Sequence, residues 1–79
     1  MGTTISFNLP TEQNISLEIF NIKGKKIKTL THSKFSKGNH AITWIGDDDF
    51  GKPVSSGVYF YKLNLNNDEN VIRKCLLLK

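Results

Sequence analysis

Three consecutive aspartates form the part of the sequence that most suggests chemistry. Asp47, Asp48 and Asp49 are followed by Gly51, and calcium loops place oxygen ligands at alternate positions before a glycine. Asp47 and Asp49 fit the first two ligand positions, but Gly51 stands where the third ligand should be. The alternative is a tight turn in which an aspartate side chain accepts hydrogen bonds from nearby backbone N–H groups. The spacing favours the turn, which requires no metal. Calcium bound by Asp47 and Asp49 is the second interpretation.

Four lysines form a basic segment earlier in the chain. Lys23, Lys25, Lys26 and Lys28 surround Gly24, which marks a turn. Nucleic-acid-binding modules combine such a patch with stacking aromatic rings or a recognition helix, and neither is evident here. Lysines also protect an exposed edge strand from pairing with other chains. The pattern favours edge protection, and we expect no nucleic-acid partner.

Side chains suited to catalysis are sparse. Ser55 and Ser56 have no histidine nearby in the sequence, and His32 and His40 lie in or beside predicted loops. No glycine-rich phosphate loop opens a helix. Cys75 is the single cysteine, which excludes an internal disulfide; a free cysteine is usually a small buried apolar residue, whereas a reactive thiolate needs an exposed electropositive setting. The sequence predicts a protein that is not an enzyme and that has no cofactor.

The elements that must position these residues have the two-residue period of β-strands. Apolar and polar residues alternate from Ile5 to Leu9 and from Ile15 to Ile19, which turns one face of each segment toward a core. Helix signals are nearly absent. Strands are expected in the segments 5–9, 15–19, 25–31, 40–45, 58–65 and 71–78.

Short strands separated by turn signals are typical of an all-β sandwich. We predict an immunoglobulin-like or fibronectin III-like β-sandwich of six to seven short antiparallel strands. Trp44 is expected at the centre of its core, because a single tryptophan buries a large area. Tyr59 and Tyr61 follow Gly57 early in a late strand, where such sandwiches turn a tyrosine hydroxyl onto the upstream backbone.

Strand pairing is less well determined by the sequence. The second and third segments read as a hairpin, and so do the fifth and sixth, which would group the first and fourth strands apart. A Greek-key crossing would pair them differently.

Length and composition limit the range of functions. The chain has 79 residues and a net charge of +4, and 38% of its residues are hydrophobic and 23% charged. These values are as expected for one small folded domain with a thin core. No apolar run approaches the roughly 20 residues that a membrane-spanning helix needs. Met1 and Gly2 are expected to be a cloning remnant, so that a single domain covers residues 3–79.

Three stretches taken together resemble a known family. The first runs from Ile15 to Leu30, the second from Gly38 through Trp44 to Leu63, and the third is the basic-then-apolar segment 73–79. Together they are similar to the type A C-terminal sorting domain of proteins exported by the bacterial type IX secretion system. They also resemble the related immunoglobulin-like domain of flagellar hook-capping proteins, and the resemblance covers residues 3–79.

The resemblance implies a secretion signal domain without catalysis, attached to an N-terminal cargo domain of the same chain. Its partners would be the type IX translocon of the outer membrane and the associated processing enzyme. The cargo would pass through the periplasm and end outside the cell or on its surface. Gly57 and Tyr59 match structural positions of the family. The residues that match the sorting signal are Arg73, Lys74, Leu76, Leu77, Leu78 and Lys79.

The alternative that the resemblance leaves open is a structural or adhesive immunoglobulin-like module. Such a module would be a flagellar hook-capping domain or an accessory domain of a secreted hydrolase. In either case an edge strand can be recognised by strand addition, in which backbone bonds give affinity and alternating side chains give specificity.

Overall fold

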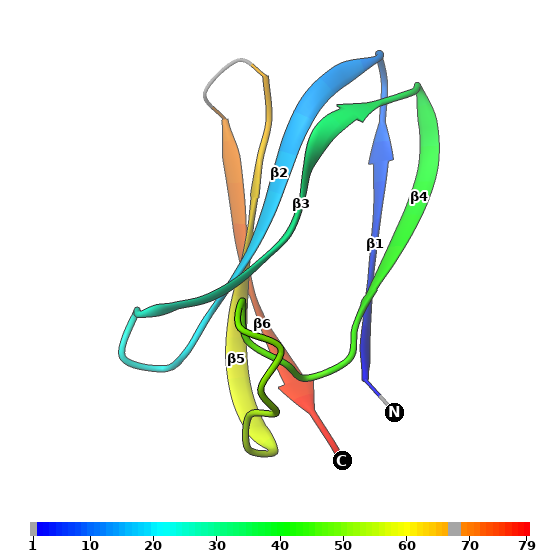
Figure 1. The fold of residues 1–79 in the computed structure, drawn as a ribbon. Coiled ribbons are helices and arrows are strands. Elements are labelled where there is room, and N and C mark those ends of the chain that lie inside the picture. Colours follow the sequence, from blue (N-terminus) through cyan, green and yellow to red (C-terminus); the bar gives the residue numbers. More distant parts are fainter. Residues whose placement is uncertain (1, 67–68) are drawn as a thin grey trace.

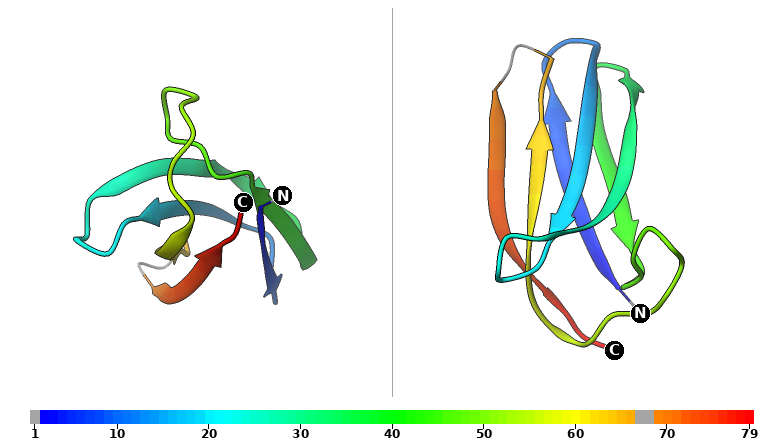
Figure 2. Two further views of the ribbon diagram at one scale, coloured as in Figure 1. Left: turned by 90° about the horizontal axis from the view of Figure 1, so that it is seen from below. Right: turned by 60° about the vertical axis from the view of Figure 1, so that its left-hand side comes forward.

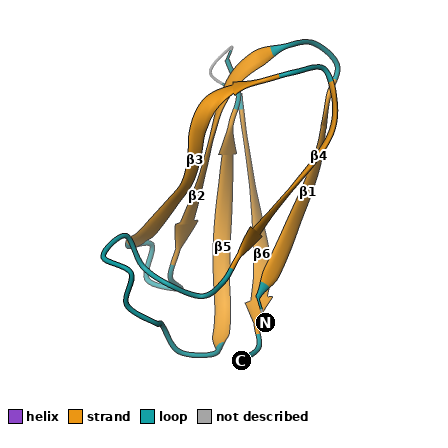
Figure 3. Cartoon of the chain, turned by 45° about the vertical axis from the view of Figure 1, so that its right-hand side comes forward, coloured by secondary structure: helices purple, strands orange, loops and turns teal. Residues whose placement is uncertain are grey.

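The computed structural model describes residues 2–66 and 69–79, so that Met1 of the expected remnant lies outside them. Within these ranges the chain forms strands and loops without a helix (Figure 3), and no segment qualifies as a helix able to span a membrane. The expected all-β architecture is confirmed, with six strands. The strands are β1 (Thr3–Leu9), β2 (Gln13–Phe20), β3 (Lys26–Phe35), β4 (Gly38–Trp44), β5 (Gly57–Asn64) and β6 (Asn70–Leu77).

The strands form two antiparallel sheets (Figure 1). β1 pairs with β4, and the larger sheet has the order β3-β2-β5-β6. The expected hairpins β2–β3 and β5–β6 are both present, and the first and fourth strands are grouped apart as predicted. Pairing of β2 with β5 joins the two hairpins. β3 and β6 are therefore the edge strands of the larger sheet.

The core lies between the two sheets and is supplied by alternate strand positions. Ile15, Leu17 and Ile19 of β2 are buried, while the residues between them face outward. Trp44, at the end of β4, is fully buried and packs edge-to-face on Tyr59 of β5, with ring centroids 4.9 Å apart. Aromatic pairs favour this arrangement because the positive edge of one ring meets the negative face of the other.

β3 extends beyond its predicted end at residue 31 and reaches Phe35. Its outer half lacks a clear alternation, and bulges in the β2–β3 pairing change its register. Phe35 packs against Phe7 and His40 of the smaller sheet, with ring centroids 5.9 and 5.0 Å away. This packing holds the end of β3 in place although its sequence gives little strand signal.

The two sheets also meet where the chain begins and ends (Figure 2). The hydroxyl of Thr3 in β1 donates a hydrogen bond to the carbonyl oxygen of Leu76 in β6, at 2.5 Å. The first residues of β1 therefore lie beside the last residues of β6, and the rest of the β6 edge is left uncovered by β1.

Candidate functional site

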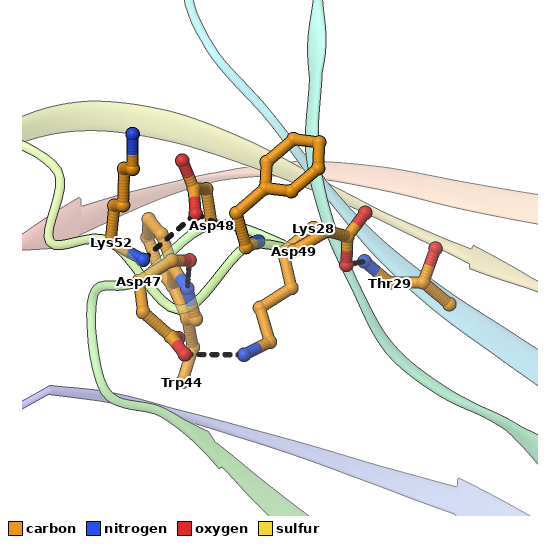
Figure 4. Close-up of polar contacts among 8 residues, drawn as sticks. Lys28, Thr29, Trp44, Asp47, Asp48, Asp49 and Lys52 are labelled. Atoms are coloured by element: carbon orange, nitrogen blue, oxygen red, sulfur yellow. Dashed lines mark hydrogen bonds and ion pairs between the residues drawn. The ribbon is translucent and has the colours of Figure 1, made fainter.

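The aspartates form a compact turn after β4 (Figure 4). The carboxylate of Asp48 accepts hydrogen bonds from the backbone N–H groups of Phe50 and Lys52, each at 2.9 Å. Gly51 takes a φ of 78°, which glycine adopts without steric cost. The hydrogen bond from the Lys52 N–H to its carboxylate lowers the pKa of Asp48 below its ordinary value. Asp48 therefore acts as the organiser of its own turn.

The two neighbouring aspartates fasten this turn to the sandwich. The side chain of Asp47 accepts from the Lys28 ammonium at 2.5 Å, and its carbonyl accepts from the Trp44 indole N–H at 2.8 Å. The carboxylate of Asp49 accepts from the Thr29 N–H at 3.0 Å, and its own N–H donates to the carbonyl of Ile27 at 3.1 Å. The loop therefore lies along the outer edge of β3 and covers the beginning of that edge, from Ile27 to Thr29.

These contacts bear on the two interpretations of the acidic loop. All three carboxylates accept bonds from groups of the protein itself. Across residues 2–66 and 69–79, no three His, Cys, Asp or Glu side chains are grouped as metal ligands would be. The turn interpretation accounts for Asp48, whereas Asp47 and Asp49 are held by partners on β3. Calcium at Asp47 and Asp49 gains no support from the geometry.

The basic segment lies on the edge strand β3 and on the turn before it, as edge protection requires. Two of its lysines are paired with carboxylates: Lys28 with Asp47, and Lys26 with Glu18 at 3.7 Å. Lys23 and Lys25 remain exposed on the β2–β3 turn. The segment is therefore partly neutralised and is not a uniform basic surface.

Most of the residues considered for catalysis have structural roles, and His32 is exposed on β3. The carbonyl of Ser55 accepts a hydrogen bond from the Tyr59 hydroxyl at 2.7 Å, which is the contact of a tyrosine corner. The hydroxyl of Ser56 accepts from the Lys79 N–H at 3.1 Å. His40 packs between aromatic rings. Cys75 is half-buried on β6, and burial raises the pKa of its thiol, which disfavours the nucleophilic thiolate.

Among the core residues expected from the sequence, Gly57 and Tyr61 differ from Trp44 and Tyr59. Tyr61 is only partly buried and packs against the rim of the core. Gly57 begins β5 with a φ of 152°, a backbone conformation that side-chain-bearing residues rarely adopt. It therefore shapes the entry to the strand that carries Tyr59.

The proposed sorting residues lie on β6 and just after it. Arg73, Lys74, Leu76 and the two residues after β6, Leu78 and Lys79, are exposed. Leu77 is different, because its side chain is fully buried in the core. A partner that binds the folded domain cannot contact the Leu77 side chain, so packing in the core explains the match of Leu77 to the signal.

The open edge of β6 offers backbone groups for pairing. The N–H and C=O groups of successive strand residues point alternately to the two sides of the strand. Because the carbonyl of Leu76 accepts a bond from Thr3 on the side away from β5, the peptide groups of Ile72 and Lys74 face that open side as well. These are the groups that an added strand would use.

The outer face of the larger sheet carries a further feature that the alternation did not reveal. Ile22, Ile72 and Leu76 are 70%, 60% and 58% exposed. Val58 lies opposite Leu76, and Phe60 lies opposite Phe20 across the β2–β5 pair. The signal available in the sequence was the unbroken apolar run 58–61, since a strand that is apolar at adjacent positions is apolar on both faces. We call these six residues the outer patch: Phe20, Ile22, Val58, Phe60, Ile72 and Leu76.

Two shallow hollows lie on this face, on either side of Ile22. One, of about 310 Å³, is lined chiefly by Phe20, Phe60 and Ile72. The other, of about 520 Å³, is lined by Val58 and Lys74 among others. Apolar side chains of the outer patch contribute to the lining of both hollows.

Two packed antiparallel sheets with a buried tryptophan and a tyrosine corner define an immunoglobulin-like β-sandwich module. A profile of the FlgD Ig-like domain family matches residues 2–69, and the chain belongs to this family. It is similar in structure to FlgD from P. aeruginosa, with a TM-score of 0.78 and 19% sequence identity, a likeness that shows the fold alone. The match covers 98% of this chain and 62% of that chain, so this chain spans less than two thirds of FlgD. No curated protein matches the chain.

The comparisons support the hook-capping resemblance and give no support to a type IX sorting domain in particular. The family match ends at residue 69, immediately before β6. The strand that carries the proposed sorting residues therefore lies outside the residues that the family profile matches.

Proposed function

We propose that this chain is a non-catalytic structural module that works by packing against other proteins of an assembly, in the manner of a hook-capping domain. The family match over residues 2–69 carries this proposal. The aspartates of the loop and Ser56 form hydrogen bonds within the domain, which supports a structural role for them. The exposed outer patch supports packing against other proteins. Such modules act through surfaces, since a fold this small has little concave surface.

The test is an in-frame deletion of residues 3–79 from the gene that encodes them, in its own host. We expect the truncated protein to accumulate while the flagellar hook is absent or incomplete in electron micrographs, with loss of motility. Normal hooks in a strain that makes the truncated protein at the parental level would contradict the proposal. Export of the truncated protein is measured in the same strains, to separate assembly from secretion.

We propose, as a second candidate, that the domain directs export through the type IX system. The observation in its favour is that β6, which lies outside the family match, is an open edge strand with exposed basic and apolar side chains. The partners would then be the translocon and its processing enzyme, which would act on a cargo domain that precedes residue 3. The cargo would reach the exterior or the cell surface through the periplasm.

A reporter with a signal peptide, fused to residues 3–79 in a host with the type IX system, tests this candidate. Export that depends on exposed residues of β6 would support it. We expect Lys74→Pro and Leu76→Ser to reduce export while the fold persists, because the Lys74 N–H faces the open edge of β6 and the Leu76 side chain is exposed. The control is Ile45→Ser, which changes an exposed residue outside β6. Retention of the parental reporter in the periplasm would reject the candidate.

A further inference from the structure

We propose that the outer patch binds an acidic amphipathic segment of a partner protein. An apolar side chain of that segment would fill the hollow beside Ile22, and its carboxylates would pair with Lys62 and Lys74. This inference rests on the proposed function as a module that packs against other proteins, and it specifies the surface and the chemistry of the partner.

The apolar part of the argument comes from cross-strand positions. Val58 faces Leu76, and Phe60 faces Phe20, so that apolar side chains are neighbours on three adjacent strands. Ile22 reaches the same face from the β2–β3 turn and borders both hollows. Contiguous exposed apolar side chains of this kind mark interaction sites, because covering them removes apolar surface from water.

The outer patch ends at a polar boundary. The side chain of Asn64 donates to the hydroxyl of Ser16 at 2.9 Å and to the carboxylate of Glu18 at 3.0 Å. Beyond this network the face is polar, and a partner gains little there. The binding surface is therefore limited to the half of the sheet near the β2–β3 turn and the end of β6.

The charges on this face specify the partner. Lys62 lies opposite Ile72, and Lys74 lies opposite Phe60, so each lysine sits directly beside an apolar side chain. Glu18 is across from Lys62, but its carboxylate contacts are with Asn64 and Lys26. Over the described ranges, no carboxylate lies within ion-pair distance of Lys62 or Lys74. A partner that places carboxylates beside an apolar side chain complements this pattern.

Two other occupants fit the face less well. A second copy packed face to face would bring lysines against lysines, and like charges across an interface are unfavourable. A single-stranded nucleic acid would match the charge, but it binds by stacking bases on aromatic rings. The two rings of the outer patch, Phe20 and Phe60, are partly buried, and its most exposed side chains are aliphatic.

The probe is a synthetic amphipathic helical peptide of about 14 residues, roughly four turns, with leucine on one face and glutamate on the other. It is titrated into the full chain, and the amide chemical shifts are followed by two-dimensional NMR. We expect shifts at Phe60, Lys62, Ile72 and Lys74, and binding that weakens as salt screens the lysines. Two matched peptides carry lysine in place of glutamate or serine in place of leucine, and neither should bind.

Variants of the chain test the two halves of the argument separately. Ile72→Ser should weaken binding about tenfold, a change of about 1.4 kcal/mol, whereas Ile45→Ser, at a site 65% exposed outside the outer patch, should leave it unchanged. Lys74→Glu should weaken binding at least as much, and Lys37→Glu on the β3–β4 turn should not. All four sites are exposed, and dispersed amide spectra show that each variant folds.

Four results would overturn the inference. The first is the absence of chemical-shift changes at about 1 mM peptide, since a dissociation constant of about 1 mM corresponds to a binding free energy of about −4 kcal/mol. The second is equal binding of the lysine peptide. The others are competition by a single-stranded oligonucleotide at the same residues and self-association of the chain through the outer patch. If the deletion strain lacks hooks while the peptide fails to bind, the proposed function survives and only this inference fails.

Discussion

The contact between Lys28 and Asp47 permits a quantitative prediction about what fastens the acidic loop. The ammonium and the carboxylate lie 2.5 Å apart, and their side chains are only 23% and 17% exposed. Exposed ion pairs contribute about 0.2–1 kcal/mol, and hydrogen bonds to charged groups about 1.5–3 kcal/mol. The second carboxylate oxygen of Asp47 is buried without a hydrogen-bond partner, which lowers the net gain. We therefore expect a coupling of about 1–2 kcal/mol.

A double-mutant cycle with Lys28→Met and Asp47→Asn measures this coupling. Denaturant unfolding is followed by the fluorescence of Trp44, the single tryptophan, which is buried and donates to the Asp47 carbonyl. Each kcal/mol corresponds to about 4–8 °C in Tm for a domain of this size. The coupling should persist in high salt, because partly buried charges are screened less than exposed ones.

The pair Lys34 and Glu12 supplies the control. Its charged atoms are 4.0 Å apart and both side chains are more than 60% exposed, so its coupling should be near zero and should vanish with salt. A coupling below about 0.3 kcal/mol for Lys28 and Asp47, or one as salt-sensitive as the control, would refute the claim that this contact fastens the loop.

Three further measurements test the roles assigned to single residues. Tyr59→Phe removes the bond to the Ser55 carbonyl and should lower the free energy of unfolding by about 0.5–1.5 kcal/mol. Tyr61→Phe should change it little, because the Tyr61 hydroxyl has no hydrogen-bond partner within residues 2–66 and 69–79. The pKa of Asp48 is lowered in the folded state. The stabilisation by its carboxylate is therefore present above the unfolded pKa of about 3.9 and is lost as the pH falls toward the folded pKa. In Asp48→Asn the free energy of unfolding should therefore depend less on pH in acid. Burial raises the pKa of the Cys75 thiol, so a disulfide reagent at neutral pH should react with the folded chain more slowly than with the unfolded chain.

The fold was largely predictable because its strands carry a strong alternation. The pattern around Ile15, Leu17 and Ile19 can bury only one face, and the turn residues between strands limit how they pair. The end of β3 was not predictable in the same way. Phe35 belongs to the strand because it packs on Phe7 and His40, which are distant in sequence, and no local pattern reports such a contact.

The functional surface was harder to predict than the fold. Turn chemistry explains Asp48 from the local sequence alone, but the partners of Asp47 and Asp49 lie on β3, about twenty residues away, which the sequence does not disclose. The outer patch was not predicted because Val58 and Phe60 alternate with Tyr59 and Tyr61 in one unbroken apolar run. Which of two adjacent apolar residues faces the core depends on the register, and the register is set by tertiary pairing.

Both candidate functions place the partner at the same side of the molecule, and Lys74 separates them. A partner on the outer face would bind the side chain of Lys74, whereas a strand added at the open edge of β6 would bind the backbone N–H of Lys74. Proline on an edge strand removes an outward-facing N–H without breaking a bond of the sheet. Recognition by strand addition should therefore be lost in Lys74→Pro and kept in Lys74→Glu. Recognition through the outer patch should be lost in Lys74→Glu, because the charge of the side chain is reversed. Lys74→Ala, which keeps the N–H and removes the charge, should weaken only the latter. Export of the reporter and binding of the acidic peptide, measured on the same three variants, assign each activity to the backbone or to the side chain of one residue.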